Sequence, residues 1–172
     1  MSIDGAPLHT VLFRLAARAP KLTLEQLMPR LTTSLANHYG AVACSIHTDR
    51  SGWAAAGAEP IRAFQKMERL DRARQETIEA DLVKKAVATR EMTSALDLED
   101  RDGIETFLNR VLGAVDIFAF PLLYEGKVRA VLVIYLSLES DPLADADVYG
   151  LMAVGELLAL AGTEIEANQQ AG

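Results

Sequence analysis

Residues 114–138 read AVDIFAFPLLYEGKVRAVLVIYLSL, with two apolar runs on either side of Glu125-Gly126. Both runs are rich in Val, Ile, Phe and Tyr, which pack well on a pleated, half-buried surface. A Gly in a two-residue connection allows the positive φ that a tight hairpin requires. The segment is therefore predicted to be an antiparallel hairpin at the centre of a single sheet.

The composition is that of an ordinary globular domain. The chain has 172 residues, of which 50% are hydrophobic and 24% charged, and a chain of this size can bury a core without disulfides or metals. The formal net charge of −7 disfavours nucleic acid and anionic membranes as partners.

Cysteine usage and the apolar runs indicate a cytoplasmic protein. Cys44 is the single cysteine, which excludes an internal disulfide and a multi-cysteine zinc site and favours a reducing compartment. The first ten residues contain no basic segment typical of a secretory signal. Charged residues interrupt every apolar run before it reaches the roughly 20 residues that a membrane helix needs.

Helical spacing dominates the first 40 residues. Pro7 to Ala19 has an apolar stripe and is predicted to be a short amphipathic helix. A second helix is predicted from the capping box at Thr23 to Tyr39, ended by Gly40 as a left-handed cap. Pro29 lies inside this helix, so we expect either a kink there or a later start.

A second hairpin is predicted from Ala41 onwards. Alternation in residues 41–48 places Val42, Cys44, Ile46 and Thr48 on one face and Ala43, Ser45 and His47 on the other. Turn residues occupy 49–52, and Trp53 to Gly57 is predicted to return as the second strand.

The rest of the chain alternates between helices and short strands. The predicted elements are a helix from Pro60 with an apolar stripe of Ile61, Phe64, Met67 and Leu70, a polar stretch 71–76, a helix 78–87, a short strand 91–95, an acidic loop 97–103, a helix 104–115 and a final helix 142–167. This order predicts an α+β domain in which helices cover one antiparallel sheet.

Two stretches resemble the GAF family of small-molecule-binding regulatory domains. DIFAFPLLYEGKVRAVLVIYL is similar to the last hairpin of that family, with Pro121-Leu122, then Gly126, then an apolar strand, although Ala130 stands where the family often has Gly. GAVACSIHTDRSG is similar to the family's first strand and turn. The resemblance covers residues 22–167, which leaves a helical extension at 1–21 and a frayed end at 168–172.

The resemblance implies a six-stranded antiparallel sheet with helices on one face and a ligand pocket on the other, and a homodimer formed through helices 22–39 and 142–167. Within the family, the cyclic-nucleotide signature has no match here. In the family, bilin attachment uses a cysteine later in the domain than Cys44, and sulfoxide reduction uses several cysteines. Neither activity is therefore expected of this chain.

Candidate ligand-binding residues come from the strands. Ser45 and His47 share the face opposite the aliphatic one, and His47 could donate to an anionic or carbonyl ligand. Trp53 could stack on a flat ligand. Ala130, Leu132 and Ile134 are predicted to pack on helices, so Tyr135, which alternates with them, is predicted on the pocket face. By resemblance, Thr93, Ser94 and Asp97 lie where ligand contacts cluster in nucleotide-binding members.

No catalytic or metal-binding set is predicted. The acids at 99, 100 and 102 have no base beside them, no metal-ligand spacing is present, and the residues do not specify a cofactor. Cys44 among apolar neighbours is expected to be inert.

The predicted function is a stand-alone, non-enzymatic sensory domain that binds a small molecule and signals through its helical face to a separate output protein. An alternative is a protein–protein adaptor or dimerisation module whose pocket is filled by its own side chains, here Phe107, Phe118, Phe120 and Tyr135. A redox enzyme that uses Cys44 is a third reading.

Overall fold

A computed structural model describes residues 24–49, 52–53, 55–59, 67–141, 143, 147 and 150–151. The predicted helix 7–19, most of the helix begun at Pro60, most of the helix 142–167 and the C-terminal end 168–172 lie outside these residues. Leu151, from the last of these helices, is helical and buried.

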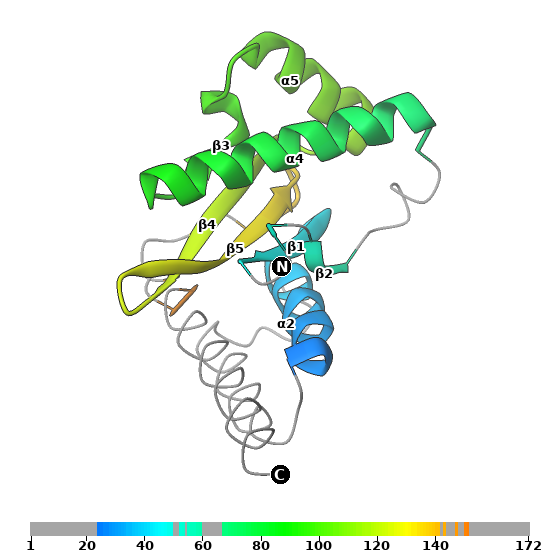
Figure 1. Ribbon diagram of the computed structural model, residues 1–172. Helices are drawn as coiled ribbons and strands as arrows, with labels where there is room; N and C mark the ends of the chain where they lie inside the picture. The colour runs from blue at the N-terminus through cyan, green and yellow to red at the C-terminus, as the bar shows by residue number, and fades with distance from the viewer. Residues whose placement is uncertain are drawn as a thin grey trace, which may run out of the picture.

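The described strands form one sheet in the order β2-β1-β5-β4-β3, and every adjacent pair is antiparallel (Figure 1). The strands are β1 (Ala43–Thr48), β2 (Ala55–Glu59), β3 (Thr93–Ser94), β4 (Asp116–Tyr124) and β5 (Lys127–Leu136). The α+β class and the antiparallel sheet are confirmed. The part of the chain that the structure describes contains five of the six expected strands.

The central hairpin is confirmed. β4 and β5 pair along their length, and Tyr124 lies opposite Lys127 across the turn. Glu125 and Gly126 have φ of 50° and 74°, and two consecutive positive φ values are typical of the turn that matches the twist of a β-hairpin.

Helices cover both faces of this sheet. α2 (Leu24–Tyr39) packs on one face, and α4 (Arg69–Thr89) crosses the other, with α5 (Arg101–Phe107) beyond it (Figure 1). α5 continues as a π-helical segment, Leu108–Leu112, and a short 3-10 turn spans Ala95–Asp97. The resemblance implied helices on one face and a pocket on the other, whereas α4 also covers the second face.

Alternate residues of β1, β4 and β5 enter two separate apolar cores. On β5, Ala130, Leu132 and Ile134 pack in the core beneath α2, whereas Val131, Val133 and Tyr135 pack in the core beneath α4. The predicted alternation of β5 is thus confirmed. Phe118 and Phe120 contact the α2 core, so they do not fill the space beneath α4.

The predicted boundaries of several helices were wrong. The polar stretch 71–76 is the beginning of α4, and Leu70, predicted in an apolar stripe, is 82% exposed. Part of the acidic loop is already helical from Arg101, and the following helix ends at Gly113, whose φ is 63°. α2 is helical from Leu24 through Pro29, so the proline does not delay the start of the helix.

Candidate functional site

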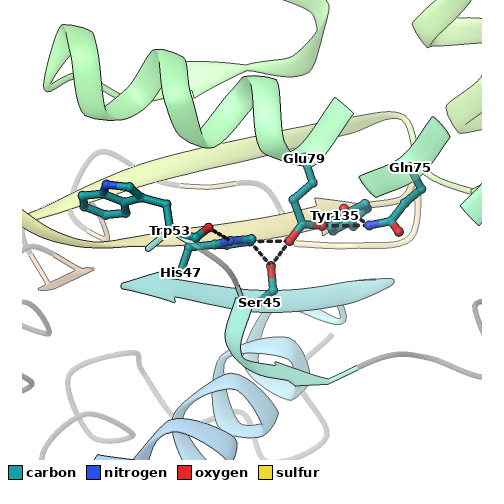
Figure 2. Close-up of polar contacts among 6 residues, drawn as sticks. All are labelled: Ser45, His47, Trp53, Gln75, Glu79 and Tyr135. Carbon is teal, nitrogen blue, oxygen red and sulfur yellow. Dashed lines mark hydrogen bonds and ion pairs between the residues drawn. The ribbon is translucent and has the colours of Figure 1, made fainter. Parts of the chain in front are cut away.

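A buried polar cluster lies between the sheet and α4. It consists of Ser45 and His47 from β1, Tyr135 from β5, and Glu79 and Gln75 from α4 (Figure 2). Ser45 and His47 are two residues apart on β1 and therefore share a face. Tyr135 joins them because β5 pairs directly with β1, with Ala43 opposite Tyr135 and Ser45 opposite Val133.

The Glu79 carboxylate is the centre of this cluster. Its Oε1 accepts a hydrogen bond from the Ser45 hydroxyl and another from His47 Nε2 at 2.6 Å. Its Oε2 accepts from the Tyr135 hydroxyl and from Gln75 Nε2 at 2.8 Å. Two donors meet each oxygen, which uses the lone-pair sites of an ionised carboxylate.

Both ring nitrogens of His47 face hydrogen-bond acceptors, an arrangement that favours the doubly protonated ring. Nδ1 lies 2.8 Å from the carbonyl oxygen of Trp53, which can only accept, and Nε2 faces the Glu79 carboxylate. Burial alone would lower the pKa of His47, but the hydrogen bond and charge of Glu79, together with the Trp53 carbonyl, raise it above its ordinary value. His47 and Glu79 are therefore a buried ion pair.

The neighbouring groups keep Glu79 ionised and Tyr135 neutral. Burial opposes ionisation of Glu79, but hydrogen bonds from His47, Ser45 and Tyr135 and the charge of His47 lower the pKa of this carboxyl. Burial and the negative charge of Glu79 raise the pKa of Tyr135 well above its ordinary value. The phenol thus remains a hydrogen-bond donor.

Glu79 and Gln75 were not among the residues predicted from the sequence. Gln75 and Glu79 are four residues apart and share a helical stripe with Leu82 and Ala86, both fully buried. A Gln and a Glu on the apolar stripe of a helix are a signal that their side chains have buried partners. That signal would have marked Glu79, although not its partners on two distant strands.

Trp53 takes part through its backbone. It lies in the turn that follows β1, with φ of 66°, and not in the second strand as predicted. Its carbonyl holds His47, while its half-buried indole packs on the α4-side core. Trp53 thus fixes the orientation of the His47 ring.

The other predicted residues lie in or just after β3, two to three strand spacings along the sheet from this cluster. Thr93 pairs with Ala119, which pairs with Val133, which pairs with Ser45. Three strand spacings, about 14 Å, therefore separate Thr93 from Ser45. The structure does not bring these two predicted groups together.

Thr93, Ser94 and Asp97 have local roles. The Thr93 hydroxyl is buried and has no hydrogen-bond partner within the described ranges. Ser94 Oγ donates to Asp116 Oδ2 at 2.6 Å and accepts from the Leu96 amide, and the Asp97 carbonyl accepts from Lys85 Nζ. Burial raises the pKa of Asp116, and the charge of Asp97 adds to this, although hydrogen bonds from Ser94 and the backbone oppose it.

Cys44 lies on the opposite side of the sheet from the cluster. It is 1% exposed and packs in the α2-side core. Within the described ranges, no group of three or more His, Cys, Asp or Glu side chains is placed to hold a metal ion. The helices described here include none that is long and apolar enough to span a bilayer.

Comparison with solved structures finds the same fold in several GAF domains. The GAF domain of an Acinetobacter phosphoenolpyruvate-protein phosphotransferase is 14% identical with a TM-score of 0.63, covering 96% of this chain and 99% of that one. The phycoerythrobilin-bound GAF domain of a cyanobacterial phytochrome is 15% identical with a TM-score of 0.60, covering 94% of this chain and 97% of that one.

A third similar structure is an enzyme, the free methionine-R-sulfoxide reductase of Neisseria meningitidis in complex with its substrate. It is 15% identical with a TM-score of 0.63, covering 100% of this chain and 96% of that one. At these identities the likeness concerns the fold alone. A comparison with curated proteins finds no match. The family model for the GAF domain, however, matches residues 23–161, and the chain therefore belongs to the GAF domain family.

Proposed function

We propose that this chain is a non-enzymatic sensory domain that binds a small molecule at the cluster of Ser45, His47, Gln75, Glu79 and Tyr135 and passes the signal to a partner protein in the cytoplasm. The observation that supports the proposal is the cluster itself. Polar side chains are expensive to bury, and four buried ones meet here with the half-buried Gln75 between a sheet and a helix.

Similar structures that contain a small molecule support the proposal that this chain binds one. One similar structure is a phycoerythrobilin-bound GAF domain, and another is a sulfoxide reductase in complex with its substrate. We propose that α4, the helix that covers the cluster, responds to the ligand. A ligand that binds more tightly to one position of α4 than to another shifts the population toward that position.

The response is proposed to leave the domain on the other side of the sheet. β1 and β5 carry the cluster on one face and the α2 core on the other. A shift of these strands would therefore reach α2. The homodimer proposed through helices 22–39 and 142–167 would use this surface, and light scattering after size-exclusion chromatography tests it by measuring the mass of the particle.

A thermal-shift screen of small metabolites against the purified protein tests the binding proposal. A ligand found in this way should stabilise wild type and the Glu76→Ala control, which alters an exposed residue of α4. It should not stabilise the double variant His47→Ala with Tyr135→Phe. A ligand that stabilises the double variant as much as wild type would show that the site lies elsewhere.

One observation favours the second candidate function, an adaptor whose interior is filled. The Glu79 carboxylate already has four donors within its own chain. Under this alternative no compound in the screen would act through the cluster, and a partner protein would bind a helical surface whether or not small molecules are present.

A further inference from the structure

The groups around the Glu79 carboxylate are all donors. Ser45 Oγ and His47 Nε2 come from β1, the Tyr135 hydroxyl from β5 and Gln75 Nε2 from α4 (Figure 2). Gln75 also donates to the Tyr135 hydroxyl at 2.7 Å, which directs the phenolic proton toward Glu79. Together they present two donors to each oxygen of one carboxylate.

The sheet positions three of these four donors independently of α4. β1 and β5 are neighbouring strands, and their register brings Ser45 and His47 close to Tyr135. The Trp53 carbonyl fixes the His47 ring. The carboxylate, in contrast, is supplied by the helix.

We infer that these four donors are a binding site for the carboxylate group of a small organic acid, and that the Glu79 side chain competes with the acid for it. This inference rests on the proposed function and adds to it the chemical class of the ligand and the group that the ligand displaces.

The hydrogen bonds favour a carboxylate over other ligand groups. The acceptor sites of Glu79 are used, so a ligand ammonium group would have to break existing bonds without replacing them. An incoming carboxylate would replace the charge and hydrogen bond by which Glu79 favours the protonated form of His47, which a neutral ligand group would not do. A phosphate has further oxygens for which these four groups have no donor, whereas a carboxylate has two.

Glu79 lies near the point where the packing of α4 against the sheet begins. The buried apolar residues of the helix begin at Ile78 and continue through Leu82, Val83 and Ala86. Before Ile78, residues 69–77 are exposed or half-buried, and half-buried Gln75 connects the cluster to the surface. A ligand can therefore approach beside Gln75, and displacement of Glu79 affects the end of α4 held mainly by polar contacts.

Removal of the Glu79 side chain should leave the donor set open for small carboxylates. The probes are sodium acetate and sodium propionate, compared with sodium chloride at equal ionic strength, in urea unfolding of Glu79→Ala. With a Kd on the order of 10 mM, about 100 mM acetate would raise the ratio of folded to unfolded protein about 11-fold relative to chloride.

Three controls separate the site from general salt effects. Glu76→Ala makes the same charge change at an exposed position of α4, and Leu82→Ala opens a buried space without donors; neither should respond to acetate beyond chloride. Glu79→Ala combined with Tyr135→Phe removes one donor and should lose most of the response.

The inference is supported if acetate or propionate stabilises Glu79→Ala more than chloride does and has no such effect on the control variants. It is also supported if Glu79→Ala fails to refold in chloride but refolds in acetate. An equal effect of acetate and chloride on Glu79→Ala, no refolding in either, or a larger effect of inorganic phosphate or methylammonium would overturn it. In those cases a metabolite that binds wild type through His47 and Tyr135 would still support the proposed function.

Discussion

His47 and Glu79 are each 7% exposed, and each depends on the other for its charge. Removal of one partner of a buried ion pair leaves an unpaired charge in the interior, which typically costs about 3–5 kcal/mol. The pair therefore contributes to stability only as a pair, and its contribution depends on pH.

The first prediction concerns that pH dependence. A raised pKa of His47 gives stability that is complete below its unfolded value of 6.5 and is lost as the pH rises through the folded value. A lowered pKa of Glu79 gives stability that is complete above its unfolded value of 4.5 and is lost as the pH falls through the folded value. The destabilisation by His47→Ala should therefore be largest between pH 4.5 and 6.5.

Urea unfolding of wild type and His47→Ala across this range checks the prediction. We expect a loss of about 3–5 kcal/mol in the free energy of unfolding inside the window and a smaller loss above it. Glu79→Gln, which neutralises the partner, should show the same window. A loss that grows steadily above pH 6.5 would mean that His47 is not protonated in the folded protein.

At the scale of elements, the β4–β5 turn depends on two positive φ values. Glu125 adopts φ of 50° although it has a Cβ, and Gly126 has 74°. Glu125→Asn should therefore stabilise the protein by about 0.5 kcal/mol, since Asn-Gly is preferred in such turns. Gly126→Ala should destabilise it by about 1–2 kcal/mol. Chemical denaturation measures both, and a stabilising Gly126→Ala would contradict the turn assignment.

α4 provides a second element-scale prediction. Leu82 is fully buried, whereas Leu70 is 82% exposed on the same helix. Leu82→Ala should lower the free energy of unfolding by about 2–5 kcal/mol, and Leu70→Ala should change it by less than about 0.5 kcal/mol. Equal losses at both positions would place residue 70 in a core and restore the apolar stripe predicted from the sequence.

The elements that could be predicted from the sequence are those whose own residues show strand alternation, a helical apolar stripe or turn residues. Alternation in residues 127–136 and the Glu125-Gly126 turn predicted the hairpin and the face of Tyr135 correctly. The beginning of α4 has no apolar stripe, since residues 71–76 are charged or polar apart from Ala73. Its helical state therefore could not be read from periodicity.

Of the candidate site, only the residues that lie on strands were predicted. Ser45, His47 and Tyr135 could be placed on one face by counting alternate residues. Glu79 depends on which helix crosses that face, and this is a tertiary contact between residues 32 to 56 apart in sequence. Thr93, Ser94 and Asp97 were predicted by resemblance, and the sheet register places Thr93 three strand spacings from Ser45.

At the scale of the whole molecule, one sheet separates two cores, and Cys44 belongs to the core away from the cluster. A thiol that is 1% exposed can react only when the protein opens. Alkylation of the native protein by iodoacetamide should therefore be slow and should accelerate in unfolding concentrations of urea. Rapid alkylation of the native protein would revive the reading of Cys44 as a redox centre.

A small molecule bound between the sheet and α4 should remain on freshly purified protein in native mass spectrometry. We expect a retained small molecule on wild type and the bare chain for the double variant His47→Ala with Tyr135→Phe. A bare wild-type chain, or the same retained mass on both proteins, would contradict it.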